Sequence, residues 1–392
     1  MFLILAVIYV IFISLGLPDS VFGVTWPVIH PEFGIAESFA SVYSVIVGAC
    51  TSGVSFFAGP VLRRFGTAKV SVVSILLTVI GLVGMSFSRS IWGMIVWAVI
   101  LGYGAGAIDT GLNSFVSLHY KARHMSFLHA FWGIGVTLSP MIMSFFLGEG
   151  GNWRNGYRTI ALIQTAILIF ALCCLKKWEA LEHSALPAAE EASDAAGEKL
   201  RLRAMPGVVL SILSLGLYCS MEFLLGTWGG SFLVNAYGLD PDVAARWVSL
   251  YYGGIMLGRL TSGFIGERLG DERLIRAGIL FSLGGMLILL LPFGAWSYVG
   301  LLPIGFGFGP IFPSVLHAVP FRFGRKFAAD LTGFHMGGAY VLGFATQLIV
   351  GFIATRTTFR IIPWVLLCYA GLLALVNALA AKKAARRGNG QE

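Results

Sequence analysis

The chain has 392 residues, a mean hydropathy of +0.83 and a formal net charge of +8. With 57% hydrophobic and only 12% charged residues, it carries more apolar side chains than soluble domains of this length can bury, so a lipid bilayer is expected to cover the remainder. All five cysteines lie in apolar runs, and we interpret them as small buried apolar side chains rather than a set of disulfides.

Twelve apolar segments follow one another along the chain, each long enough to cross a hydrocarbon core of about 30 Å. The first has no basic leader and no small-residue cleavage site, so we keep it as a span. We therefore expect an all-α membrane protein with twelve transmembrane helices. They lie near residues 2–27, 37–59, 67–87, 91–118, 124–147, 156–175, 206–235, 244–266, 273–293, 295–319, 327–354 and 361–381.

A single long polar connection divides these spans six and six. We expect an N-terminal six-helix bundle at 1–177, a cytoplasmic linker at 178–204, and a C-terminal six-helix bundle with a short basic tail at 205–392. Most of the 27 lysines and arginines fall in the loops on the side of the two termini, so both termini are expected in the cytoplasm, with the chain in the cell or inner membrane. The same loops account for the net charge without a nucleic-acid partner.

An internal repeat relates the two sets of six spans. A shift of 203 residues places residues 19–23 (DSVFG) on 222–226 (EFLLG), and also the glycine motif 102–106 (GYGAG) on 305–309 (GFGFG). A shift of 204 does the same for the loops that begin at Gly59 and Gly263. The match predicts two pseudo-symmetric halves with acids at equivalent positions.

The two related loops, 59–69 and 263–273, resemble the G-x-L-a-D-R-x-G-R-K signature of the major facilitator superfamily. The second copy is the better match, because Arg63 replaces the expected acid in the first. In that family the loop latches an inner gate through an acid and neighbouring arginines. The resemblance thus implies a major facilitator fold, with inner-gate roles for Arg64, Arg259, Glu267 and Arg268.

A narrower resemblance is to the fucose permease branch of fucose, glucose and galactose carriers. It rests on residues 104–113 (GAGAIDTGLN), 128–135 (LHAFWGIG), 153–158 (WRNGYR) and 309–313 (GPIFP). In this branch the acids that match Asp19 and Asp109 form the proton-coupling and substrate-gating pair. The resemblance therefore implies symport of a monosaccharide with protons.

Ionisable side chains at membrane depth are costly unless they face a polar path, so they are candidates for function. The acids within spans are Asp19, Asp109 and Glu222, and Arg259 is the base. In the resembled fold the helices that carry the acids line one central cavity, where a carboxyl group takes up a proton more readily than in water. We predict proton coupling through these three acids, although an acidic cluster can also coordinate sodium.

Sugar binding needs hydrogen-bonding side chains for hydroxyl groups and aromatic faces for the apolar side of the ring. The alternative for each candidate is a packing residue or an anchor at the membrane surface. The predicted substrate-binding residues are Asn113, His129, Trp132, Gln164, Trp26, Trp228, Tyr252, Phe334, His335 and Gln347.

The sequence contains no Walker A loop, no H-E-x-x-H pair, no G-x-S-x-G elbow and no paired C-x-x-C. We therefore do not expect an enzyme, and we expect no catalytic residues, no metal site and no cofactor. Our prediction is a monomeric secondary transporter in the lipid bilayer that moves a sugar-like solute with protons by alternating access. The alternative is a proton-driven exporter of drugs or metabolites, because the same fold supports both.

Overall fold

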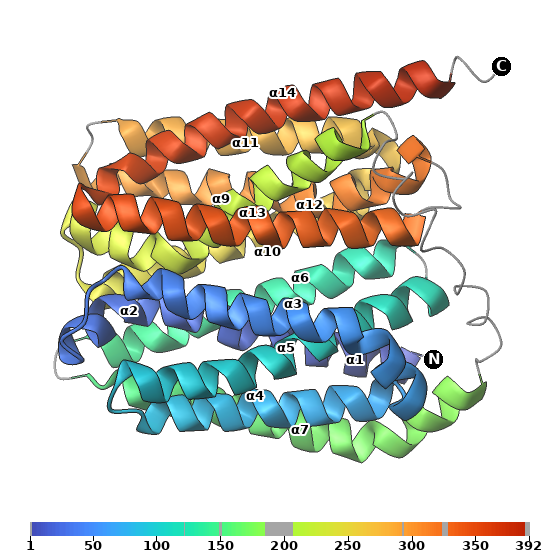
Figure 1. Ribbon diagram of the computed structural model, residues 1–392, viewed down its shortest axis with the longest axis horizontal. Coiled ribbons are helices and arrows are strands. Elements are labelled where there is room, and N and C mark those ends of the chain that lie inside the picture. Colours follow the sequence, from blue (N-terminus) through green and yellow to red (C-terminus); the bar gives the residue numbers. More distant parts are fainter. Residues whose placement is uncertain are drawn as a thin grey trace.

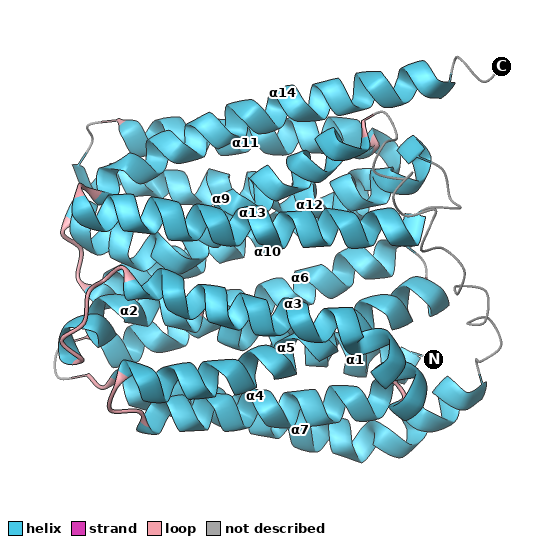
Figure 2. Cartoon of the chain, in the orientation of Figure 1, coloured by secondary structure: helices cyan, strands magenta, loops and turns pink. Residues whose placement is uncertain are grey.

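A computed structural model describes residues 2–120, 122–148, 151–184, 207–291, 294–323 and 328–388. Within these ranges every regular element is a helix (Figure 2). The first half holds α1 (Phe2–Asp19), α2 (Val21–Glu32), α3 (Phe39–Phe65), α4 (Thr67–Phe87), α5 (Ile91–His119), α6 (Ala122–Leu147) and α7 (Trp153–Ser184). The second half holds α9 (Val208–Tyr237), α10 (Pro241–Leu269), α11 (Asp271–Leu290), α12 (Leu301–Phe323), α13 (Ala328–Arg356) and α14 (Ile362–Gly388), with short 3₁₀ turns at Gly294–Gly300 and Phe359–Ile361.

The number of spans agrees with the sequence prediction. In the described part of the chain, ten helices are long and apolar enough to cross a membrane, and α1 and α2 count together as one of them, Ile4–Glu32. The helices α3 and α10 complete the expected twelve, since α3 contains the apolar stretch Phe39–Val54 and α10 is an equally long helix that carries more charge. Most of the predicted linker, residues 185–204, lies outside the described residues.

The long helices lie side by side along one direction (Figure 1). The helix α1 begins and α14 ends at the same end of the bundle, on the right in Figure 1, which we call the terminus end; the other we call the opposite end. The largest cluster of buried apolar side chains draws on both halves, and a second one, around Ile8 and Trp178, belongs to the first half.

The predicted repeat appears in the packing of the two glycine motifs. In 102–106, a Cβ atom on Gly102 or Gly106 would collide with α3, and one on Gly104 would collide with α4. In 305–309, a Cβ atom on the first or third glycine would collide with α10, and one on the second with α11. These partners are the second and third spans of their halves. The glycines therefore form close-packed helix faces that occupy the same place in each half.

The two related loops share one backbone geometry. Gly66 follows α3 with φ 80° and ψ 155°, and Gly270 follows α10 with φ 76° and ψ 158°. Residues with a side chain rarely adopt a positive φ, so glycine is needed at both turns. The loop signature found in the sequence thus marks the same sharp helix-to-helix turn twice.

The first span is broken in the middle. The helix α1 ends at Asp19, and α2 begins at Val21. Pro18 lies in the last turn of α1, where its ring leaves the carbonyl group of Ser14 without the usual helical donor. The break places Asp19 at an interruption of the helix, well inside the span Ile4–Glu32.

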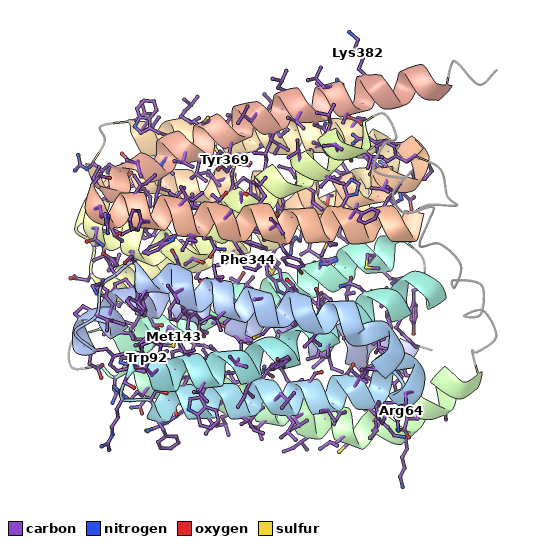
Figure 3. The ribbon with its side chains drawn as sticks, viewed as in Figure 1. Arg64, Trp92, Met143, Phe344, Tyr369 and Lys382 are labelled. Carbon is purple, nitrogen blue, oxygen red and sulfur yellow. The ribbon has the colours of Figure 1, made fainter. Side chains whose placement is uncertain are left out.

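The two halves contact each other closely toward the opposite end. The Ser41 hydroxyl donates to the Gln347 carbonyl oxygen at 3.0 Å, and the Ser44 and Thr227 hydroxyl groups lie 3.3 Å apart. A Cβ atom on Gly48 would collide with the ring of Phe344, which lies between the halves in Figure 3. Ser41, Gly48 and Gln347 lie in the parts of α3 and α13 that are close to the opposite end. The helices α6 and α10 also contact each other close to the terminus end, where the rings of Phe127 and Phe264 lie 5.5 Å apart.

Candidate functional site

The centre of the site is a hydrogen bond between two helices of the first half. The indole Nε1 of Trp132, on α6, donates to Asp19 Oδ2 at 2.7 Å. The Asp19 side chain is exposed although it lies in the middle of a membrane span. The carboxylate therefore lies at the break of the first span with part of its surface uncovered by protein, which is the position expected of a functional acid at membrane depth.

Trp132 also contacts the second half. The guanidinium carbon of Arg259, on α10, lies 4.5 Å from the centroid of the Trp132 ring, which is the geometry of a cation–π contact. Arg259 Nη2 lies 3.4 Å from Glu222 Oε1 on α9, so the two form an ion pair. Arg259 and Glu222 are only 4% and 6% exposed. One tryptophan thus connects an accessible acid of the first half to a buried ion pair of the second.

Three polar atoms of this buried region lack a hydrogen-bond partner within the described residues. They are Arg259 Nε and the hydroxyl groups of Tyr218 and Tyr251. Buried polar groups are normally satisfied, because an unpaired one costs about 1–3 kcal/mol. Arg259 Nη1 reaches the His129 carbonyl oxygen only at a long 3.4 Å. The arginine therefore keeps donor capacity that another arrangement of the site, or a substrate, could use.

Aromatic rings surround this pair. The Tyr252 ring meets Trp132 edge to face at 6.4 Å and lies 5.0 Å from the Tyr251 ring, and Tyr252 is buried. The His129 ring packs edge to face between Phe12, at 5.8 Å, and Phe312, at 5.6 Å. Of the predicted binding residues, the structure brings Trp132, Tyr252 and His129 together around Asp19 and Arg259.

Asp109 has its own partner on α5. Asn113 Nδ2 donates to Asp109 Oδ1 at 2.8 Å and to the Asp109 carbonyl oxygen at 3.0 Å, one helical turn away. Both side chains are half-buried. Among the hydrogen bonds of the described residues, none links this pair directly to Asp19. Asp109 and Asn113 therefore form a second polar point, separate from the contact between Asp19 and Trp132.

Three predicted binding residues lie toward the opposite end or inside one half. Gln164 is buried and donates to the Thr78 hydroxyl at 3.1 Å, which ties α7 to α4. Trp26 donates to the Glu37 carbonyl oxygen at 2.7 Å. Gln347 joins α13 to α9, because its side-chain oxygen accepts from Thr227 at 2.7 Å.

The remaining three also have structural partners. Trp228 is buried and donates to the Gln347 carbonyl oxygen at 3.2 Å. His335 is buried beside α9, where its Nε2 lies 2.8 Å from the Ser211 hydroxyl. Phe334 packs on a small apolar cluster around Val208. The structure does not gather these six residues around the central acids.

The predicted inner-gate residues separate into two places. Arg64, Glu267 and Arg268 are exposed at the terminus end, and Figure 3 shows Arg64 pointing away from the bundle there. Arg64 lies over its neighbour Phe65, with its guanidinium carbon 5.2 Å from the ring centroid. Arg259 instead belongs to the central cluster.

Charged contacts at the terminus end involve residues that the sequence interpretation passed over. Glu272 pairs with Arg322, and Asp271 Oδ2 lies 2.8 Å from His317 Nδ1, so both join α11 to α12. Asp271 and Glu272 lie in the first turn of α11, directly after Gly270, and this position in the sequence could have indicated charged contacts here. Phe12 and Phe312 were missed as neighbours of the central site, because apolar and aromatic side chains are common throughout these spans.

Two repeated six-helix bundles with charged side chains at mid-span define a multi-pass membrane transporter. A profile of the Major Facilitator Superfamily matches residues 8–347, and the chain belongs to this superfamily of transporters, which are not enzymes. The solved structure of a D-xylose–proton symporter has the same fold, with a TM-score of 0.72 at 12% identity over 97% of both chains. A bacterial homologue of the human lysosomal transporter Spinster, solved in an inward-facing conformation, gives a TM-score of 0.66 at 12% identity, covering 97% of this chain and 96% of that one.

Two curated relatives extend over most of the chain. A glucose/mannose transporter of Bacillus subtilis is 22% identical over 312 residues, which cover 76% of this chain and 74% of the relative. A probable sulfoacetate transporter of Cupriavidus necator is 24% identical over 387 residues, which cover 90% of this chain and 86% of the relative.

Proposed function

We propose that the protein is a proton-coupled symporter of a monosaccharide that works by alternating access, with its termini in the cytoplasm. The observation that carries the proposal is the connection from Asp19 through Trp132 to the pair of Arg259 and Glu222. It joins a water-accessible acid in one half to a buried ion pair in the other. A proton on Asp19 can therefore change a contact on which the arrangement of the halves depends.

The coupling step follows from hydrogen-bond chemistry. Ionised Asp19 accepts the indole N–H of Trp132, and this charge-assisted bond is stronger than one between neutral groups. A proton on Asp19 removes the charge and weakens the bond. Trp132 can then turn, and its contact with Arg259 changes as well. Asp109 and Asn113 provide a second polar point near the same path.

A sugar suits the exposed carboxylate of Asp19 and the half-buried ring of Trp132 beside it. The Trp132 ring offers a flat apolar face, and Asp19 accepts hydrogen bonds from hydroxyl groups. The names of two relatives support this substrate class, because one is a glucose/mannose transporter and the other is named a putative glucose/galactose transporter, of Helicobacter pylori.

A second candidate substrate is a small organic anion. It is favoured by Arg259, whose Nε donor lacks a partner in the described part of the chain, and by the probable sulfoacetate transporter among the relatives. An anion would have to approach a site that also contains Asp19 and Glu222. The sugar therefore remains our first candidate.

The test is uptake into proteoliposomes. We expect a sugar from a panel of monosaccharides to accumulate only with an inward proton gradient, and sodium to have no effect. Asp19→Asn should abolish accumulation but keep exchange of labelled for unlabelled sugar, because the asparagine cannot carry the proton. The matched control is Asp242→Asn, an acid that pairs with Arg246 inside its own helix.

The outcomes separate the candidates. Accumulation that persists in Asp19→Asn would contradict the coupling role. Uptake of sulfonates or dicarboxylates without any sugar would replace the sugar with the organic anion. Competition by lipophilic cations alone would favour the exporter of drugs or metabolites.

A further inference from the structure

A pocket of about 410 Å³ lies at the opposite end of the first half, away from the central site. It is formed where α2, α4 and α7 end or begin, and its charged lining consists of Glu32, Arg89, Arg154 and Arg158. The membrane spans of this half end at Glu32 and Phe87 and begin at Trp153. The pocket therefore lies at the membrane surface, between hydrocarbon and water. Trp92, near the start of α5, is labelled at the same end of the bundle in Figure 3.

The charges in the pocket do not balance. Glu32 Oε1 pairs with Arg154 Nη2 at 2.6 Å, and the other oxygen of Glu32 accepts the indole N–H of Trp153 at 2.6 Å. Arg154 also donates to the Ser88 carbonyl oxygen at 3.1 Å. One arginine is thus neutralised and fixed in place, and both oxygens of the single carboxylate are occupied.

Two arginines remain without an acidic partner within the described residues. Arg158 donates to the neutral side chain of Asn155 at 3.1 Å, and its guanidinium carbon lies 4.9 Å from the centroid of the Phe87 ring. Arg89 is exposed and lines the same pocket. Their fixed positive charges face a space large enough for a phosphate group, and guanidinium groups bind phosphate oxygens in pairs.

The surface beside the pocket is apolar on both neighbouring helices. On α4, Phe87 is 66% exposed, and Val83 is also exposed one turn deeper. On α7, Leu162 is 70% exposed one turn deeper than Arg158. The helices α4 and α7 pack against each other, so these exposed side chains form one apolar surface beside the pocket. A soluble anion would make no use of this surface, but acyl chains would.

We propose that this pocket binds the headgroup of an anionic phospholipid. Arg89 and Arg158 contact the phosphate beside the pair of Glu32 and Arg154, and the acyl chains follow α4 and α7. The attraction of arginines near a membrane surface for anionic lipid supplies the affinity. The site is separate from the transport path, so this proposal does not depend on the proposed function.

The test is binding of phosphatidylglycerol to the purified full-length protein, titrated in detergent and counted by native mass spectrometry, with phosphatidylcholine as the neutral comparison. Each arginine should contribute about fivefold, so Arg89→Gln with Arg158→Gln should weaken binding on the order of 25-fold. The matched control is Arg356→Gln. Arg356 is exposed at the same end of the bundle and lies over Phe352 at 3.8 Å, but it is outside the pocket.

A second variant moves the affinity in the other direction. Glu32→Gln removes the only acid of the pocket and should tighten phosphatidylglycerol binding about fivefold. Equal binding by the wild type and both pocket variants would overturn the proposal. Full competition by soluble glycerol phosphate, at the affinity of the lipid, would show that a free anion occupies the pocket and would overturn the lipid assignment.

Discussion

The two halves of the molecule hold equivalent acids in opposite ways. Glu222, in the second half, is 6% exposed and pairs with Arg259, which is 4% exposed. Asp19, its counterpart in the first half, is exposed and is held by the neutral indole of Trp132. A buried charge needs its counter-charge in every state of the protein, whereas an exposed one can gain or lose a proton. We therefore expect a structural role for Glu222 and the proton-carrying role for Asp19.

The largest effect should come from breaking the buried pair. Arg259→Leu leaves Glu222 as an uncompensated buried charge, which costs about 3–5 kcal/mol in the free energy of unfolding. Replacing both residues with leucine should recover most of this loss, because no charge then remains buried. The measurement is thermal or denaturant unfolding of the purified variants in detergent. If Arg259→Leu alone is as stable as the wild type, Glu222 does not need its partner and the contrast between the halves fails.

A smaller effect should come from the contact between the halves. A Cβ atom on Gly23 would overlap the Gly226 carbonyl group, so Gly23→Ala should cost about 1–3 kcal/mol by forcing α2 and α9 apart. The matched control is Gly284→Ala in α11, where no atom of a neighbouring element lies within 4 Å and the change should stabilise the protein by about 0.5–1 kcal/mol. The same unfolding measurement applies. Equal stability of the two variants would show that the close approach at Gly23 is not needed.

The sequence predicts depth in the membrane far better than it predicts which way a helix faces. Hydropathy located the spans, and the spacing of glycines located the repeat, since both depend on position along the chain. The rotation of each helix about its axis depends on packing against its neighbours, which no local pattern records. Gln164 and Trp26 are the right residue types for a sugar site, yet both make contacts inside the helix packing.

Arg259 illustrates the same point for the site. Its place within α10 predicted a charged residue at membrane depth, and the resemblance assigned it to the inner gate. The contact with Trp132 and the pair with Glu222 come from three different helices, α6, α9 and α10. Such a meeting point depends on the crossing of distant segments, and only the structure supplies it.

The smallest effect should come from removing one hydrogen bond at the centre of the comparison. Trp132→Phe keeps an aromatic ring beneath Arg259 but deletes the donor to Asp19. Because Asp19 is exposed, water replaces part of the lost bond, and we expect a loss of about 1 kcal/mol rather than the larger value for a buried charged group. Asp19→Asn and Trp132→Phe should then be non-additive in unfolding measurements, with a coupling energy of about 1 kcal/mol. Trp132→Leu should cost a further 0.5–2 kcal/mol, roughly the range of a cation–π contact. Additive effects of Asp19→Asn and Trp132→Phe would mean that the hydrogen bond from Trp132 does not couple Asp19 to the second half. The coupling path would then run through Asp109.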